Sequence, residues 1–187
     1  MGAFDRTTAR KAGFDVRVAS SPEIIGGHAW TTGYIPLTSS ERPAMPTRME
    51  PGQGCDVNQL SDAKRTVETV VDDDGEHELA TCYAIRDKGL VVITSCGHRG
   101  VINSIRQARA ASGIDRVHAV IGGFHLVAPR SPDEATATVD ALEDIAPDYI
   151  VPMHCTGETF VAEAMQRMPS RVIRPYVGSR LHLGSRA

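Results

Sequence analysis

Three β-prone runs of this chain each lead into a turn that contains both glycine and histidine, and this pattern constrains the fold more than any other feature. The runs cover residues 90–94, 117–121 and 149–152, and they are short and apolar, as buried strands are. The turns that follow them are Ser95-Cys96-Gly97-His98-Arg99-Gly100, Gly122-Gly123-Phe124-His125-Leu126 and Met153-His154-Cys155-Thr156-Gly157.

Helical signals separate these strands. Residues 101–111 carry apolar side chains at helical spacing, and Gly113 follows as a C-cap. Residues 131–145 begin with a Ser-Pro-Asp-Glu capping box, and residues 158–168 predict a third helix. Alternating strands and helices favour an α/β fold with a parallel sheet, whose strand carboxyl ends meet at one ligand-binding edge. We therefore expect the three imidazoles at one rim.

A histidine cluster at such a rim predicts a metal site. Neutral imidazole is a strong ligand for zinc, and catalytic zinc sites typically use three protein ligands and leave one position for water. The pKa of such a water falls to about 7, which makes it a nucleophile near neutral pH. One histidine beside a strand end is more often a packing or capping residue, but three at matching positions favour function. The histidines without this context are His28, His77, His118 and His182.

Two cysteines beside these histidines open another interpretation, a Cys/His nucleophile. Cys96 and Cys155 each lie one or two residues from a histidine, and such neighbours on one turn rarely form an oriented nucleophile–base pair. Cys155 also fits the role of a small buried residue. Neither G-x-S-x-G nor G-x-x-x-x-G-K-[ST] occurs, which argues against a serine α/β-hydrolase and a P-loop enzyme.

Composition excludes several other classes. With 187 residues, 41% apolar and 23% charged, the chain has the length of one domain and an ordinary globular composition. Its net charge of −3, without a long basic run, argues against a nucleic-acid partner. No window approaches the roughly 18 apolar residues of a membrane helix. The first residues lack an apolar signal core, so we expect a cytoplasmic protein whose four cysteines are reduced.

The first third of the chain carries weaker signals. Residues 14–18 alternate between apolar and polar and predict a strand, and residues 30–35 form another short β-prone run. Residues 36–61 contain four prolines and no periodicity, which predicts a long loop. This loop is either a cover over the site, on which Arg42 or Arg48 meets an anionic substrate, or a solvated segment.

Two further β features are expected from local patterns. The Asp-Gly pair at 74–75 separates β-prone runs at 66–71 and 79–85, which predicts a hairpin. The tail carries short β-prone stretches around 172–173 and 181–183, which predict one or two more strands.

The run from Gly89 to Asn103, together with the G-G-F-H-L and H-C-T-G turns, resembles the metallo-β-lactamase superfamily. Within it, the chain most resembles the branch of metal-dependent hydrolases that includes the dihydropterin ribofuranosyl-aminobenzene phosphate synthases. That branch has similar G-C-[SA]-H-x-G, G-G-F-H-L and H-C-T-G turns. The likeness is specific over about residues 76–184, and residues 32–36 resemble the branch's T-G-x-I-P segment. The resemblance implies an αββα sandwich with a metal site at one edge of its two sheets.

The resemblance also implies roles for individual residues. By position, His98 and His154 are implied to be metal ligands, and His125 to be a further ligand or a residue that lines the site. Cys96 stands where other branches place a bridging aspartate, so it is implied to face the metals. The implied cofactor is zinc or another divalent transition metal such as manganese or iron, and the implied partner is a small-molecule substrate. The other lining residues are Gly123 and Thr156.

One expected segment is missing from the sequence. The H-x-H-x-D-H segment that defines the superfamily does not occur in these 187 residues. Residues 1–187 therefore resemble the second half of the sandwich as one partial domain, a β-meander followed by strand/helix units. A fragment or truncated gene product, a separate chain for the first half, and a degenerate site all remain open. A half sandwich exposes an apolar sheet face, which predicts self-association or binding of an upstream half-domain chain.

The leading functional prediction is a metal-dependent hydrolase, in which a metal-activated water attacks an ester, a phosphoester or a lactone-like small molecule. The first alternative is a non-catalytic remnant, or one half of a split enzyme that acts as an interaction module. That alternative predicts no stabilisation by zinc or manganese. The second alternative is a pterin-pathway synthase, which the family resemblance alone implies.

Overall fold

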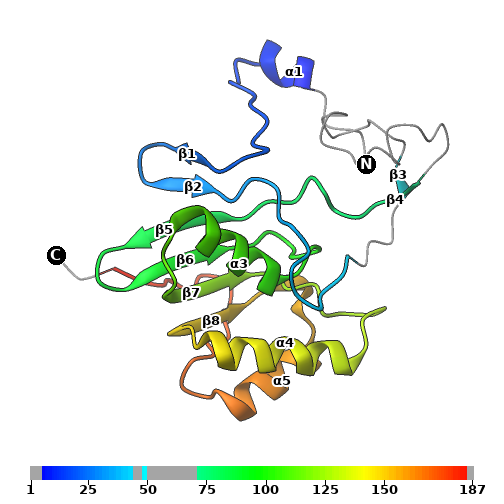
Figure 1. The fold of residues 1–187 in the computed structure, drawn as a ribbon, viewed down its shortest axis with the longest axis vertical. Coiled ribbons are helices and arrows are strands. Elements are labelled where there is room, and N and C mark those ends of the chain that lie inside the picture. Colours follow the sequence, from blue (N-terminus) through cyan, green and yellow to red (C-terminus); the bar gives the residue numbers. More distant parts are fainter. Residues whose placement is uncertain (1–5, 44–47, 50–70, 185–187) are drawn as a thin grey trace.

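The computed structural model describes residues 6–43, 48–49 and 71–184, and its centre is a six-stranded mixed sheet (Figure 1). The strand order is β1-β2-β5-β6-β7-β8. These strands are β1 (Glu23–Ile25), β2 (Ala29–Thr31), β5 (Thr81–Ile85), β6 (Gly89–Ile93), β7 (Val117–Gly122) and β8 (Tyr149–Pro152). A separate pair consists of β3 (Arg48–Met49) and β4 (Val71–Asp72). The helices are α1 (Arg6–Lys11), α3 (Val101–Ser112), α4 (Pro132–Ile145), the 3-10 turn η2 (His154–Thr156) and α5 (Glu158–Arg167).

The second half of the sheet has the predicted alternation of strand and helix. β6, β7 and β8 are parallel, and α3 and α4 connect them in turn. Gly113 ends α3 in the left-handed conformation, at φ 70°, and its N–H donates to the carbonyl of Arg109. Ser131 and Glu134 form the reciprocal hydrogen bonds of a capping box at the start of α4. The prediction of an α/β fold is thus confirmed, and the ends of these helices lie where their capping residues predicted.

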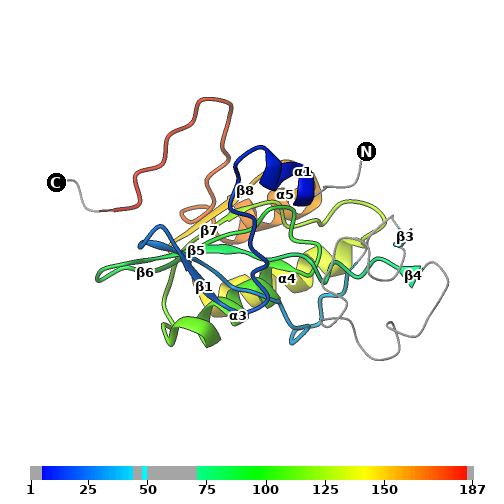
Figure 2. The ribbon, with the colours of Figure 1, turned by 90° about the horizontal axis from the view of Figure 1, so that it is seen from above.

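Strand register assigns one face of the sheet to the helices. Trp30, Cys82, Val92, Val120 and Ile150 are direct partners across five neighbouring strands, so their side chains point to the same side. The last four belong to the buried core, and Trp30 packs against it. α3 and α4 lie on this side of the sheet in the view from above (Figure 2). Burial of this apolar row against the helices stabilises the fold.

The opposite face of the sheet is less covered. Tyr83, Val91, Ala119 and Tyr149 are direct partners in the next row. The two inner residues are buried, whereas Tyr83 and Tyr149 are 38% and 36% exposed. On this side lie α1 and the C-terminal segment (Figure 2), and the carbonyl of Leu183 accepts a hydrogen bond there from the Lys88 ammonium. The described residues therefore form a sheet with α3 and α4 on one face and α1 and the C-terminal segment on the other.

The predicted hairpin across residues 74–75 is wrong. β4 pairs with β3, while β5 pairs with β2 and β6. The carboxylates of Asp73 and Asp74 accept hydrogen bonds from the backbone N–H groups of Gly75 and Glu76, so this segment forms Asx turns. Residues 66–70 lie outside the described residues, as does most of the 36–61 loop. Within that loop, residues 36–43 have no regular structure, and Arg48–Met49 form β3.

The predicted strands at 14–18 and 181–183 are also wrong, because neither segment pairs with another strand. Phe14 is 68% exposed, so this segment does not bury the apolar side of its alternating pattern. The carbonyl of Leu183 accepts from the Lys88 ammonium and contacts the His118 ring rather than a strand. Val172 does form an isolated parallel bridge with Ile150. No helix in the described part of the chain is long and apolar enough to cross a membrane.

Candidate metal centre

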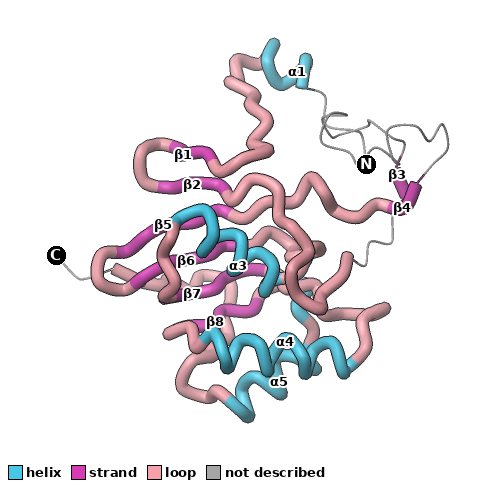
Figure 3. Tube along the Cα trace, in the orientation of Figure 1, coloured by secondary structure: helices cyan, strands magenta, loops and turns pink. Residues whose placement is uncertain are grey.

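The three histidine turns meet at the carboxyl ends of β6, β7 and β8, as the sequence predicted. The loops that leave these strands gather at one end of the sheet (Figure 3). Backbone hydrogen bonds join neighbouring turns: the Gly123 N–H donates to Ser95 O at 3.1 Å, and the Met153 N–H donates to Gly122 O at 2.8 Å. The Thr94 hydroxyl also donates to Gly123 O at 2.9 Å. The rim is therefore a backbone-bonded layer that fixes where each turn places its side chains.

Two glycines allow the turns to approach this closely. A Cβ atom at Gly97, where φ is 74°, would lie 2.5 Å from the carbonyl oxygen of Gly123. A Cβ atom at Gly123 would lie 2.7 Å from both Cys155 Sγ and His154 Nε2. Both separations are well below van der Waals contact. Gly97 meets backbone at a positive φ, so that position requires glycine, whereas a Cβ atom at Gly123 would displace the ends of two side chains. Gly123, predicted to line the site, thus lies directly against the side chains of the third turn.

The first cluster at the rim contains two thiols and one imidazole. Cys96 Sγ is 3.4 Å from His154 Nε2, and the Cys155 thiol donates to the carbonyl of Cys96 at 3.3 Å. The ligand atoms of all three residues lie within 4.8 Å of one another. Burial raises the pKa of the Cys155 thiol, which the nearby Cys96 thiol raises further. The Cys–His contact at the rim therefore joins different turns, rather than neighbours on one turn.

The second cluster is a pair of imidazoles. The rings of His98 and His125 are in edge contact, with centroids 4.4 Å apart. Burial lowers the pKa of His125, and the charges of His98 and Arg130 lower it further. The Nδ1 atom of His125 is buried and has no hydrogen-bond partner among the described residues. The neutral form of this ring is thus favoured, and its Nδ1 atom is available to a hydrogen-bond partner or a metal ion.

The three predicted histidines do not form one tight group. Among the described residues, the set of three ligand atoms close enough to share an ion consists of Cys96, His154 and Cys155. His98 and His125 contact each other instead. The buried Thr156 hydroxyl donates to Met153 O at 2.7 Å and accepts from the Phe124 N–H at 3.3 Å, so it links two turns.

Sequence reasoning missed a buried carboxylate behind His98. Glu78 accepts hydrogen bonds from the backbone N–H groups of His98 and Arg99, at 2.9 and 2.7 Å. Its Oε1 atom is also 3.3 Å from the Nδ1 atom of the His98 ring. A carboxylate behind a ligating histidine fixes the ring orientation and tautomer. Glu78 lies 20 residues before His98 and outside any motif, so no local pattern marks it.

Sequence reasoning also missed the role of Arg130. Its side chain is 3% exposed. Its guanidinium donates to the carbonyls of His125 and His98, at 3.1 and 3.4 Å, and to the carbonyl of Arg42. It therefore ties the two imidazole turns to the segment before residue 44. The Arg42 side chain itself bonds to backbone carbonyls of Ser39 and Glu41.

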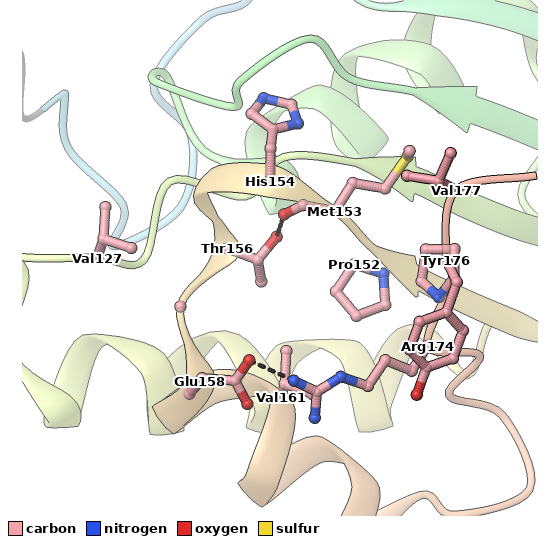
Figure 4. Close-up of a pocket in the computed structure, with 12 residues that line it drawn as sticks. Val127, Pro152, Met153, His154, Thr156, Glu158, Val161, Arg174, Tyr176 and Val177 are labelled. Carbon is pink, nitrogen blue, oxygen red and sulfur yellow. Dashed lines mark hydrogen bonds and ion pairs between the residues drawn. The ribbon is translucent and has the colours of Figure 1, made fainter.

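A cleft of about 580 Å³ adjoins the third turn (Figure 4). In this view the His154 ring points away from the ion pair between Glu158 and Arg174, which lies at the far side of the cleft. Most of the lining is apolar or aromatic, which suits a small organic molecule. The principal lining residues are Val127, Pro152, Met153, Thr156, Val161 and Tyr176.

Comparison with solved structures defines the class of this fold. The crystal structure of Tm1679, a metal-dependent hydrolase of the β-lactamase superfamily, matches with a TM-score of 0.70 and 26% sequence identity. The match covers 92% of this chain and 59% of Tm1679. The chain therefore has the fold of the metallo-β-lactamase superfamily, over part of the length of such a protein. No protein-family model matches the chain.

Curated relatives agree with the branch suggested by the sequence. The chain is 36% identical over 96 residues to the 7,8-dihydropterin-6-methyl-4-(β-D-ribofuranosyl)-aminobenzene-5'-phosphate synthase of Methanocaldococcus jannaschii. This match covers 51% of the chain and 31% of that protein. An uncharacterised protein of the same organism is 34% identical over 143 residues, which cover 76% of the chain and 46% of that protein. The chain thus spans less than half the length of these relatives, and its resemblance to them is confirmed.

Proposed function

We propose that this chain contributes a divalent transition-metal site at the rim and serves the hydrolysis of an ester, a phosphoester or a lactone-like small molecule. The observation that carries the proposal is the convergence of three histidine turns at the ends of parallel strands. The similarity to a metal-dependent hydrolase supports the class of reaction. The adjoining cleft offers room for a small-molecule substrate.

The side chains present at the rim fit such an ion. Imidazole and thiolate groups are the ligands that zinc and similar transition metals prefer. The unpartnered buried Nδ1 atom of His125 supports the same conclusion, because buried polar atoms normally have a partner. His154 beside Cys96 and, on the neighbouring turns, the pair of His98 and His125 are the groups that would hold metal at the rim. When bound, zinc, manganese or iron supplies a Lewis acid and a water nucleophile active near neutral pH.

The remaining roles belong to residues behind the rim. Glu78 contacts the Nδ1 side of His98, which would leave Nε2 as the ligating atom. Arg130 fixes the carbonyls of His98 and His125, so that the two imidazoles keep their relative position. These contacts limit movement of the ligands before a substrate enters.

Replacing His98 or His154 with alanine is expected to weaken metal binding by roughly 10–100-fold or more, because each change deletes a ligand. The measurement is metal content by elemental analysis after dialysis, followed by titration of zinc into the metal-free chain. The matched control is His182→Ala, which removes an exposed imidazole outside the site. Unchanged metal content and affinity in both site variants would contradict the proposal.

Measuring the melting temperature of the chain while zinc or manganese is added tests the non-catalytic alternative. The partly exposed row that contains Tyr83 and Tyr149 favours an interaction module, because aromatic side chains left partly exposed on a sheet face can pack against a second copy or an upstream half-domain chain. A metal binder gains stability by mass action, whereas a remnant without a site does not. A rise in melting temperature with zinc or manganese thus argues against a purely structural role.

A pterin-pathway synthase is the second candidate function. The 36% identity to the archaeal synthase over 96 residues favours it, since those residues make up half of this chain. A reduced pterin added to the metal-loaded chain is expected to bind in the cleft beside the His154 turn. Calorimetry measures the binding of this pterin and of a lactone of similar size. Binding of the pterin alone favours the synthase, and binding of the lactone alone favours the hydrolase.

The Glu78→Gln substitution is expected to lower metal affinity by about 10–100-fold, because an amide cannot accept every bond that the carboxylate accepts from the His98 turn. The free energy of unfolding should fall by about 1–3 kcal/mol, since one buried N–H loses its acceptor. Glu143→Gln on the surface is the control. Loss of stability with unchanged metal affinity would show that Glu78 supports the turn without positioning the imidazole.

A further inference from the structure

We propose that Cys96, His154 and Cys155 form a sulfur–nitrogen–sulfur site for Zn²⁺ at the rim of the sheet. The proposal deepens the proposed function, on which it rests, by naming the donor set and the metal. It differs from the histidine set that the sequence predicted, because both cysteines become ligands of this ion and His154 is the imidazole of the cluster. The cluster stands on its own geometry, in which three ligand atoms from two turns lie within 4.8 Å of one another.

The distances suit a tetrahedral ion. Zn–S and Zn–N bonds of about 2.3 and 2.0–2.1 Å place tetrahedral ligand atoms roughly 3.5–3.8 Å apart. The Cys96 Sγ to His154 Nε2 distance is already 3.4 Å, and no pair in the cluster exceeds 4.8 Å. Small side-chain rotations would therefore bring the cluster to zinc geometry, while the backbone stays in place. The imidazole is exposed and the two thiols are half-buried, so an ion can reach them from solvent.

The backbone around the cluster is built for close contact. The turn of Cys96 and the turn of Cys155 are 59 residues apart, yet the Cys155 thiol reaches the Cys96 carbonyl at 3.3 Å. Gly123 lies between them, and a methyl group there would lie only 2.7 Å from both Cys155 Sγ and His154 Nε2. The two side chains thus pack against bare backbone on one side, which holds them toward each other. A pair of surface cysteines without such support would have no fixed separation.

The donor chemistry selects the cation. Two thiolates and an imidazole favour zinc over magnesium, calcium or manganese, which prefer oxygen ligands. On binding, each S–H bond breaks, an S–Zn bond forms and the proton passes to solvent, so binding releases protons without any oxidant. Three protein ligands also leave a fourth position open, as in catalytic zinc sites.

Cobalt reports thiolate ligation directly. Co²⁺ titrated into the reduced full chain is expected to give thiolate-to-cobalt charge-transfer bands in the near ultraviolet. Cys96→Ser and Cys155→Ser should each remove much of this absorption and weaken Zn²⁺ binding by roughly tenfold or more. Cys82→Ala is the matched control, because Cys82 is a buried thiol in the core beneath the helices. Its bands and its Zn²⁺ affinity should equal those of the unmodified chain.

Gly123→Ala gives a second test that leaves every ligand in place. The added methyl group would displace the ends of two flexible side chains rather than backbone, so the fold should persist by circular dichroism while the charge-transfer bands weaken. In parallel, Zn²⁺ should slow alkylation of Cys96 and Cys155 by iodoacetamide, as mapped by peptide mass. The alkylation of Cys82 should not depend on zinc.

The outcomes separate this inference from the proposed function. Cobalt binding without charge-transfer bands, lost in His98→Ala but not in Cys96→Ser or Cys155→Ser, overturns the thiolate site and leaves a histidine metal site standing. Absence of binding in the unmodified chain overturns both. If zinc does not change the alkylation rate of Cys96 and Cys155, and the cobalt bands are absent, the cluster is a hydrogen-bonded Cys–His contact without metal. That result also overturns the inference.

Discussion

The Arg99→Met variant is expected to lose about 3–5 kcal/mol of unfolding free energy, because one buried and two part-buried hydrogen-bond acceptors lose their donor, and an acceptor stranded away from water costs about 1–3 kcal/mol. Arg99 is 2% exposed, although it lies one residue after His98 in the turn. Its guanidinium donates to the carbonyls of Ile35 and Asp74, at 2.6 and 2.9 Å. Methionine would fill part of the volume but donate none of these bonds.

The aromatic contact adds to the effect. The Tyr34 hydroxyl accepts a hydrogen bond from Arg99 at 3.0 Å, and its ring lies 4.8 Å from the centre of the guanidinium. Lysine keeps the charge but cannot form this planar set of bonds, so Arg99→Lys should recover only part of the loss. Urea unfolding followed by the fluorescence of Trp30 measures both variants.

The control for Arg99 is Arg86→Met, which removes an exposed guanidinium from the turn between β5 and β6. Its unfolding free energy should stay within about 0.5 kcal/mol of the unmodified chain, as is usual for surface substitutions. A loss below about 1 kcal/mol in Arg99→Met would contradict the prediction, because it would mean that water replaces the missing donors.

Local sequence patterns predicted the helix ends and the buried strands, because these features depend on residues close together in the chain. The start of α4 follows from Ser131 and Glu134, and the end of α3 follows from Gly113. The apolar strands at 90–94 and 149–152 needed burial on both faces, so a parallel sheet with helical connections was the consistent solution. The meeting of the three turns then follows from topology alone, since parallel strands present their carboxyl ends at one edge.

The failures came from features that only tertiary structure determines. The Asp-Gly pair at 74–75 forms a local turn, but β5 has longer apolar partners in β2 and β6 than β4 could offer. The approach of Cys96 to His154 spans 58 residues, so no spacing rule predicts it. Glu78 behind His98 is invisible for the same reason. The sequence thus located the rim, while the donor atoms that converge on it depend on packing between turns.

The packing beneath the second histidine turn carries the other large expected effect. Phe124 lies between Gly123 and His125, and its ring meets Phe160 of α5 edge to face, with centroids 5.4 Å apart. Both rings are at most 1% exposed. Phe160→Ala is expected to cost about 3–5 kcal/mol of unfolding free energy, because it deletes buried apolar surface and leaves a cavity.

The matched control for Phe160 is Met165→Ala on the same helix, where the side chain is 43% exposed. It should change the unfolding free energy by about 0.5 kcal/mol or less, since little buried surface is lost. Phe160→Leu, which fills much of the cavity, should fall between the two. Equal stability of Phe160→Ala and Met165→Ala in urea would show that α5 does not share the core of the sheet.

The Phe160 variant also connects core packing to the site. Because Phe124 is anchored by Phe160 while its neighbours Gly123 and His125 belong to the rim, a cavity under this ring lets the turn move without changing any ligand. A displacement of about 1 Å is enough to degrade a functional site. Zinc should therefore bind more weakly to Phe160→Ala than to Met165→Ala under conditions where both remain folded. Equal zinc affinities would mean that the backbone bonds between turns, rather than the aromatic anchor, hold the ligands in position.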